Sequence, residues 1–86
     1  MTELKESFGS WMGKIPGRLR AEEVAKILGF AEHDIPVLVR YKLLRPLGQP
    51  SQQSTKYFAA VEILEYREDV KWLNKATKIA SGYWKR

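Results

Sequence analysis

The sequence predicts a mainly α fold that carries one small β-hairpin. Apolar residues recur three or four positions apart in segments 20–28, 34–42 and 68–83, which is the spacing of amphipathic helices. A glycine and a proline stand where the first of these helices should end and the second should begin. Two short apolar segments flank a polar loop in the middle of the chain, as the strands of a hairpin do.

The first helix is expected at Arg20–Leu28. Glu22 and Glu23 fall in its first turn, where the helix dipole stabilises negative charge. Gly29 follows the last periodic residue and suits a left-handed C-cap. The apolar stripe expected to be buried consists of Val24, Ala25, Ile27 and Leu28.

The second helix is expected from Asp34 to Lys42. Asp34 is a suitable N-cap because its carboxylate can accept hydrogen bonds from backbone N–H groups at the helix start. Pro36 then falls in the first turn, where a missing N–H costs little. Pro36 and Val37 are expected to point outward, and the residues expected to face inward are Ile35, Leu38 and Val39.

Two short strands, Leu44–Leu47 and Thr55–Phe58, are expected to form the hairpin. The loop between them, Gly48–Ser54, is polar, uncharged and rich in turn formers. A short helix at Ala59–Glu65 and a longer one at Glu68–Tyr83 complete the chain. The order helix, helix, hairpin, helix, helix describes a winged helix-turn-helix domain.

The chain divides into an arm and one small domain. Residues 20–84 are expected to form the winged helix-turn-helix domain, since 86 residues suffice for a single core. Residues 1–19 are expected to form a partly ordered N-terminal arm, because glycines and a proline there oppose a long helix. The apolar stripe of this arm consists of Leu4, Phe8, Trp11 and Met12.

The composition excludes several classes of protein. The absence of cysteine removes disulfides, thiolate nucleophiles and Cys-based zinc sites. No segment approaches the roughly 18 apolar residues of a membrane span, and the charged N-terminus lacks the apolar run of a signal peptide. We therefore expect a cytoplasmic protein without a membrane partner.

Basic residues concentrate in the second part of the sequence. Residues 1–34 hold five basic and six acidic side chains, whereas residues 35–86 hold ten basic and four acidic ones. This asymmetry favours a polyanionic partner, and nucleic acid is the commonest one. A solvated surface that keeps a small protein soluble is the alternative.

Nothing in the sequence predicts an enzyme, a cofactor, a metal site or a small-molecule substrate. His33 is the single histidine, and a turn residue is the better interpretation than a ligand. No apolar pocket is expected that would split the pKa values of paired carboxylates, and no Gly-rich phosphate loop follows a strand. The carboxylate pairs that we interpret as solvated helix faces are Glu22/Glu23, Glu62/Glu65 and Glu68/Asp69.

Four positions predict the helix-turn-helix itself. Ala25 is small enough for a second helix to cross close by, and Gly29 makes the left-handed turn. Ile35 and Leu38 then hold the second helix on the first. This spacing is typical of bacterial DNA-binding regulators.

The continuation of the chain, LLRP and then KYFAAVEILEY, resembles MerR-type and excisionase-type domains over roughly residues 20–64. In those families the second helix sits in the major groove, and the wing lies on the sugar-phosphate backbone. The resemblance implies that Tyr57 packs under the wing. It also implies backbone contacts from Arg40 and Lys42 on the second helix and from Arg45 and Lys56 on the wing.

His33 and Val37 complete the expected DNA-binding set, Val37 through contact with a thymine methyl group. Few further base readers are expected, because Glu32 and Asp34 at the start of the second helix repel phosphate. The wing loop Gly48–Ser54 also lacks Lys and Arg. The main hypothesis is therefore a small protein that binds double-stranded DNA chiefly through its backbone, as a transcription regulator or an architectural factor in recombination.

The last helix leaves two alternatives open. Lys71, Lys75 and Lys78 share one face, which is either a secondary phosphate contact or a solvated surface. The rival function is a protein-interaction module without DNA binding. Its contact would be the wing edge or the helix that carries Trp72 and Trp84, and a homodimer is one form of it.

Overall fold

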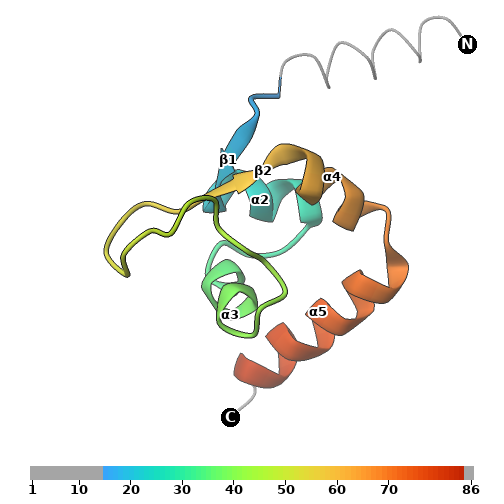
Figure 1. The fold of residues 1–86 in the computed structure, drawn as a ribbon. Coiled ribbons are helices and arrows are strands. Elements are labelled where there is room, and N and C mark those ends of the chain that lie inside the picture. The colour runs from blue at the N-terminus through green and yellow to red at the C-terminus, as the bar shows by residue number, and fades with distance from the viewer. Residues whose placement is uncertain (1–14, 85–86) are drawn as a thin grey trace, which may run out of the picture.

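The computed structural model describes residues 15–84, and their fold is mainly helical, as the sequence predicts (Figure 1). These residues form four helices and one two-stranded antiparallel sheet. The expected apolar stripe of the N-terminal arm lies outside the described residues. The elements in chain order are β1 (Arg18–Arg20), α2 (Ala21–Leu28), α3 (Asp34–Arg40), β2 (Tyr57–Ala59), α4 (Ala60–Arg67) and α5 (Val70–Trp84).

The sheet pairs two segments that the sequence analysis did not pair. β1 runs antiparallel to β2 and places Leu19 opposite Phe58. Both side chains are buried, with exposed fractions of 2% and 1%. The Ala60 N–H also donates a hydrogen bond to the Gly17 carbonyl oxygen at 2.9 Å, so the contact continues beyond the strands. The domain therefore begins before Arg20, inside the segment that we expected to be an arm.

The prediction of a strand at Leu44–Leu47 is wrong. These residues lie in an irregular connection, and its link to β2 is one hydrogen bond of 2.7 Å from the Leu47 N–H to the Tyr57 carbonyl oxygen. Pro46 explains the difference, because a proline has no N–H to contribute to a strand ladder. The expected hairpin is thus replaced by a long loop that projects from the helices (Figure 1).

The turn between α2 and α3 has the predicted geometry. Gly29 has a φ of 86°, the left-handed conformation in which glycine carries no Cβ penalty. The N–H groups of Gly29 and Phe30 both donate to the Ala25 carbonyl oxygen, at 2.8 and 2.9 Å. At the other end of α2, the Glu23 carboxylate accepts a hydrogen bond of 2.8 Å from the Arg20 N–H. The first helix is therefore confirmed to within one residue.

The second helix begins at Asp34 as predicted, but its N-cap and its C-terminal end differ from the prediction. Asp34 is the first helical residue and His33 is the N-cap, so the expected capping by Asp34 is wrong. The helix ends at Arg40, and Lys42 has a φ of 67° outside it. The Leu43 N–H donates to the Leu38 carbonyl oxygen at 2.9 Å, which closes a left-handed C-terminal turn. This turn directs the chain inward, so that Leu44 is buried.

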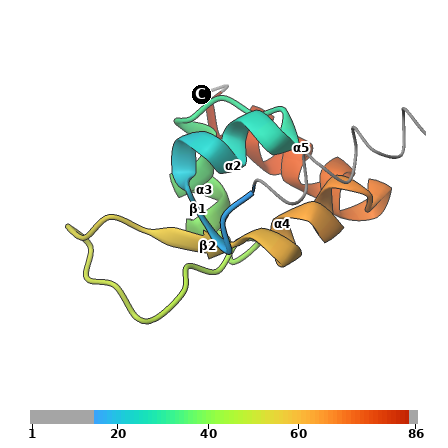
Figure 2. The same cartoon turned by 90° about the horizontal axis from the view of Figure 1, so that it is seen from above.

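α4 packs on α2, and α5 packs on both α3 and α4, so the apolar core lies between the helices and the sheet (Figure 2). Ala76 and Ala80 are the buried residues of α5, and their small side chains allow a close approach. Trp72 stacks on Tyr66 with ring centroids 4.3 Å apart and donates its indole N–H to the Leu43 carbonyl oxygen at 3.2 Å. The fully buried large side chains are Val24, Ile35, Leu38, Leu44, Phe58 and Ile63.

We predict that Leu19→Ala lowers the free energy of unfolding by about 2–5 kcal/mol, the usual cost of truncating a buried leucine. Leu47→Ala, the matched change at an exposed leucine, should cost at most about 1 kcal/mol. Urea unfolding followed by circular dichroism measures both values. Equal costs would contradict the pairing of β1 with β2.

Tyr66 makes the free energy of unfolding depend on pH in the alkaline range. Burial, and next the charge of Glu62, raise the pKa of Tyr66 above its ordinary value of 10.0. The contribution of the neutral phenol to stability is therefore complete below about pH 10 and is lost as the pH rises through the raised pKa. Stability of Tyr66→Phe should fall less steeply above about pH 10 than that of the unaltered chain, as urea midpoints measured along a pH series would show.

Candidate nucleic-acid interface

α3 presents a narrow exposed face. His33, Pro36 and Arg40 are exposed and lie three or four residues apart, so they share one side of the helix. Val37 has an exposed fraction of 4%. Its expected outward position is therefore wrong, because α5 packs against α3 and closes that side of the helix. A contact between Val37 and a base would need this packing to open.

The end of α5 holds the start of α3. The Trp84 indole N–H donates to Asp34 Oδ1 at 2.9 Å, and the Ala31 N–H donates to Asp34 Oδ2 at 3.2 Å. The Trp84 ring also meets the His33 ring edge-on at 4.9 Å. Asp34 is thus a hydrogen-bonded carboxylate in contact with α5, and its negative charge remains at the start of α3. The sequence carries no local signal for a contact that spans 50 residues.

The long loop between α3 and β2 stands apart from the helices and leaves two grooves beside them. One groove of about 280 Å³ lies between α3 and the loop and includes Pro36, Gln52 and Lys56. Its apolar floor is made by Ala21, Ile35, Val39 and Phe58. We call this space the α3–loop groove. Lys56 lines this groove, and Arg40 lies one helical turn after Pro36 on the same exposed face of α3.

The second groove has mixed charge. It has a volume of about 350 Å³ and lies between the start of α2 and the same loop. Arg20 and Lys56 line it together with Glu22 and Glu32. Lys56 borders both grooves, and its ammonium group donates to the Gln52 carbonyl oxygen at 3.3 Å. The loop therefore holds Lys56 beside α3, although the loop tip Gly48–Ser54 is uncharged.

The structure separates the other two expected backbone contacts from this region. Arg45 is close enough to Tyr66 to lower the pKa of that phenol, which burial and Glu62 raise, so Arg45 lies near the last turn of α4. Lys42 is exposed but stands in the left-handed turn after α3. Neither residue lines the α3–loop groove. The predicted set of four is therefore not one surface.

Arg18 is an exposed basic residue on strand β1 that the sequence did not indicate as a site residue. Its guanidinium lies 3.8 Å from the centroid of the Tyr57 ring, a cation–π contact. The Tyr57 ring is half-buried, and the exposed Arg18 side chain packs on it at the sheet. Only the pairing of β1 with β2 brings these two residues together.

The expected lysine strip of α5 faces solvent, as both the phosphate-contact and the solvated-surface interpretations require. Lys71, Lys75 and Lys78 are all exposed. The Trp72 ring stacks on Tyr66 and its N–H is hydrogen-bonded to Leu43, so Trp72 is unsuited to contact a partner. Trp84 has an exposed fraction of 52% and remains available.

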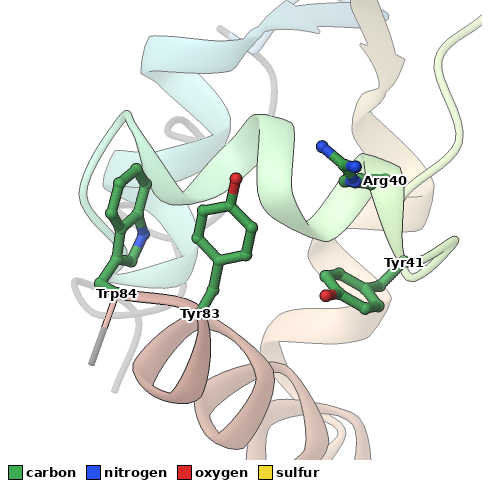
Figure 3. Close-up of a pocket in the computed structure, with 4 residues that line it drawn as sticks. All are labelled: Arg40, Tyr41, Tyr83 and Trp84. Carbon is green, nitrogen blue, oxygen red and sulfur yellow. The ribbon is translucent and has the colours of Figure 1, made fainter. Parts of the chain in front are cut away.

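A third groove lies where the ends of α3 and α5 meet. Arg40 and Tyr41 line it from the α3 side, and Tyr83 and Trp84 from the α5 side (Figure 3). Its volume is about 420 Å³. We call it the aromatic groove. It combines ring faces with one guanidinium group, a composition that suits flat anionic ligands.

Within residues 15–84, no cluster of three or more His, Asp and Glu side chains is placed to hold a metal ion. Across the same residues, no helix combines the length and apolar character needed to cross a membrane. Comparison of the chain with protein-family models, with curated proteins and with solved structures found no match.

We predict that Lys42→Gly raises the free energy of unfolding by about 0.5–1 kcal/mol, because glycine adopts a φ of 67° without strain. Thermal unfolding measures the change. Lys26→Gly, a matched loss of one lysine inside helix α2, should instead destabilise by about 1 kcal/mol. A destabilised Lys42→Gly variant would contradict the left-handed turn.

Proposed function

We propose that the protein is a small DNA-binding protein with a winged helix-turn-helix of the excisionase or MerR-like kind. In this proposal α2 and α3 are the helix-turn-helix, and the loop between α3 and β2 is the wing. α3 docks in the major groove, and the wing lies on the sugar-phosphate backbone. The role is that of a cytoplasmic transcription regulator or an architectural factor in recombination, without a cofactor.

The observation that carries the proposal is the position of Arg40 and Lys56. They come from different elements: Lys56 lines the α3–loop groove, and Arg40 lies on α3 one helical turn after Pro36, which lines the same groove. Within the described chain no acidic side chain pairs with either of them. Two unpaired cations on α3 and on the loop beside it suit contacts with the phosphates of a duplex.

The geometry supports backbone contact more than base reading. Val37 is buried and Pro36 has no polar group, which leaves His33 and Arg40 as the base-reaching side chains of the exposed α3 face. Arginine can bind guanine through two hydrogen bonds, but one such contact distinguishes few sequences. We therefore expect modest sequence preference and strong salt dependence.

A protein-interaction module, with a homodimer as its simplest form, is the second candidate. The half-exposed Trp84 favours it, since tryptophan is enriched in interface hot spots. Trp72 does not contribute to this candidate, because its ring and its N–H are both occupied inside the chain.

We predict that mixed-sequence duplex DNA shifts the amide signals of residues 40–56 in a chemical-shift titration at low salt. Arg40→Glu and Lys56→Glu should each weaken binding on the order of tenfold, because each replaces a phosphate contact with repulsion. With two phosphate contacts, raising salt from ~50 to ~200 mM should weaken binding by about tenfold.

Lys26→Glu is the matched control, because it reverses the same charge on α2 and lines neither groove beside the loop. Its affinity should stay close to that of the unaltered chain. An unmoved spectrum of residues 40–56 would overturn the DNA proposal. Sedimentation that shows a concentration-dependent dimer, together with loss of that dimer in Trp84→Ala, would favour the second candidate.

A further inference from the structure

The aromatic groove is a second surface, distinct from the α3–loop groove. The residues that line it do not line either groove beside the loop. Its volume of about 420 Å³ lies within the roughly 300–1,000 Å³ of ordinary ligand sites. The groove is therefore large enough for one flat ring system with its attached polar groups.

Two rings of this groove are exposed, and the Trp84 ring is held in place by contacts within the chain. Tyr41 and Trp84 have exposed fractions of 49% and 52%. Tyr83 meets Trp84 edge-on at 4.9 Å, and its ring extends from α5 toward α3 (Figure 3). Trp84 is fixed further by its hydrogen bond of 2.9 Å to Asp34. Rings that are ordered before binding lose little conformational entropy when a ligand stacks on them.

The charge of the groove is positive. Arg40 is the one charged residue among those lining it, and no acidic side chain of residues 15–84 pairs with Arg40. Lys42 follows two positions later, in the turn after α3, and is exposed. A ligand that matches this surface carries a flat ring and a negative charge.

We propose that the aromatic groove binds an unpaired nucleotide of single-stranded nucleic acid. The base stacks on the exposed ring of Tyr41, and Arg40 contacts the phosphate. Stacking of bases on aromatic side chains beside a cationic path is the general basis of single-strand binding. The inference goes beyond the proposed duplex contact, and Arg40 is the residue that both surfaces share.

The groove favours a nucleotide over an acidic peptide. A single strand supplies one flat ring and one phosphate in every unit, which is the pairing that the groove presents. An acidic peptide supplies the charge, but most of its side chains have no ring to stack on Tyr41.

The test measures binding of a fluorescently labelled short oligothymidylate to the full chain by anisotropy. Tyr41→Ala should weaken binding by about tenfold, because one stacking ring is lost. Tyr41→Phe, which keeps the ring, should bind as the unaltered chain does. Tyr41 makes no side-chain hydrogen bond within the described chain, so circular dichroism should show both variants folded. Equal affinity of Tyr41→Ala and the unaltered chain overturns the proposal.

Two competitors separate stacking from charge. An abasic deoxyribose-phosphate oligomer of the same length should bind about tenfold more weakly than the oligothymidylate. If it binds equally well, charge alone explains the binding and the proposal fails. An acidic peptide that competes better than the oligothymidylate also overturns it, in favour of a protein partner.

The two proposals can fail separately. Tyr41→Ala should leave duplex binding unchanged, because Tyr41 lies outside the α3–loop groove. If the chain does not bind duplex DNA but binds oligothymidylate in a way that depends on Tyr41, only the duplex proposal fails. If the chain binds duplex DNA and Tyr41→Ala does not change the affinity for oligothymidylate, only the aromatic-groove proposal fails.

Discussion

The pairing of β1 with β2 is the constraint on which the rest of the fold depends. Each strand runs directly into a helix, β1 into α2 and β2 into α4. The register that sets Leu19 opposite Phe58 therefore also fixes where both helices begin and how they pack on each other. Because both side chains are almost completely buried, the pair ties the start of the described chain to its centre. α3 then follows α2 through the rigid turn at Gly29, so its direction is set by the same pair.

α5 decides which part of α3 meets solvent. Small buried side chains bring α5 close to its neighbours, and Trp72 and Trp84 anchor its two ends to Leu43 and Asp34. This packing covers Val37 and provides a partner for the Asp34 carboxylate. The same packing thus buries an apolar base reader and holds the Asp34 carboxylate against α5. The exposed face of α3 is therefore better suited to bind charged groups than to read base edges.

Two surfaces of different character meet at Arg40. On one side the α3–loop groove has an apolar floor and is lined by Lys56. On the other side the aromatic groove offers the exposed rings of Tyr41 and Trp84, of which Trp84 is fixed by its hydrogen bond to Asp34. A guanidinium group suits both, since it binds phosphate through paired hydrogen bonds and also stacks on flat rings. A small chain can therefore place contacts for paired and unpaired nucleic acid next to each other without a deep pocket.

The local sequence by itself determined the helices and the turn between the first two. The end of α2 follows from Gly29, and α5 follows from apolar periodicity, because these signals act within a few residues. Of the expected site, Lys56 lines the α3–loop groove and Arg40 shares the exposed face of α3 with Pro36, whereas Arg45 lies beside α4. Only the tertiary structure decided the strand pairing, the burial of Val37 and the existence of the aromatic groove. Each of these depends on contacts between residues far apart in the chain, and a three-residue strand such as β1 is too short to show a period of its own.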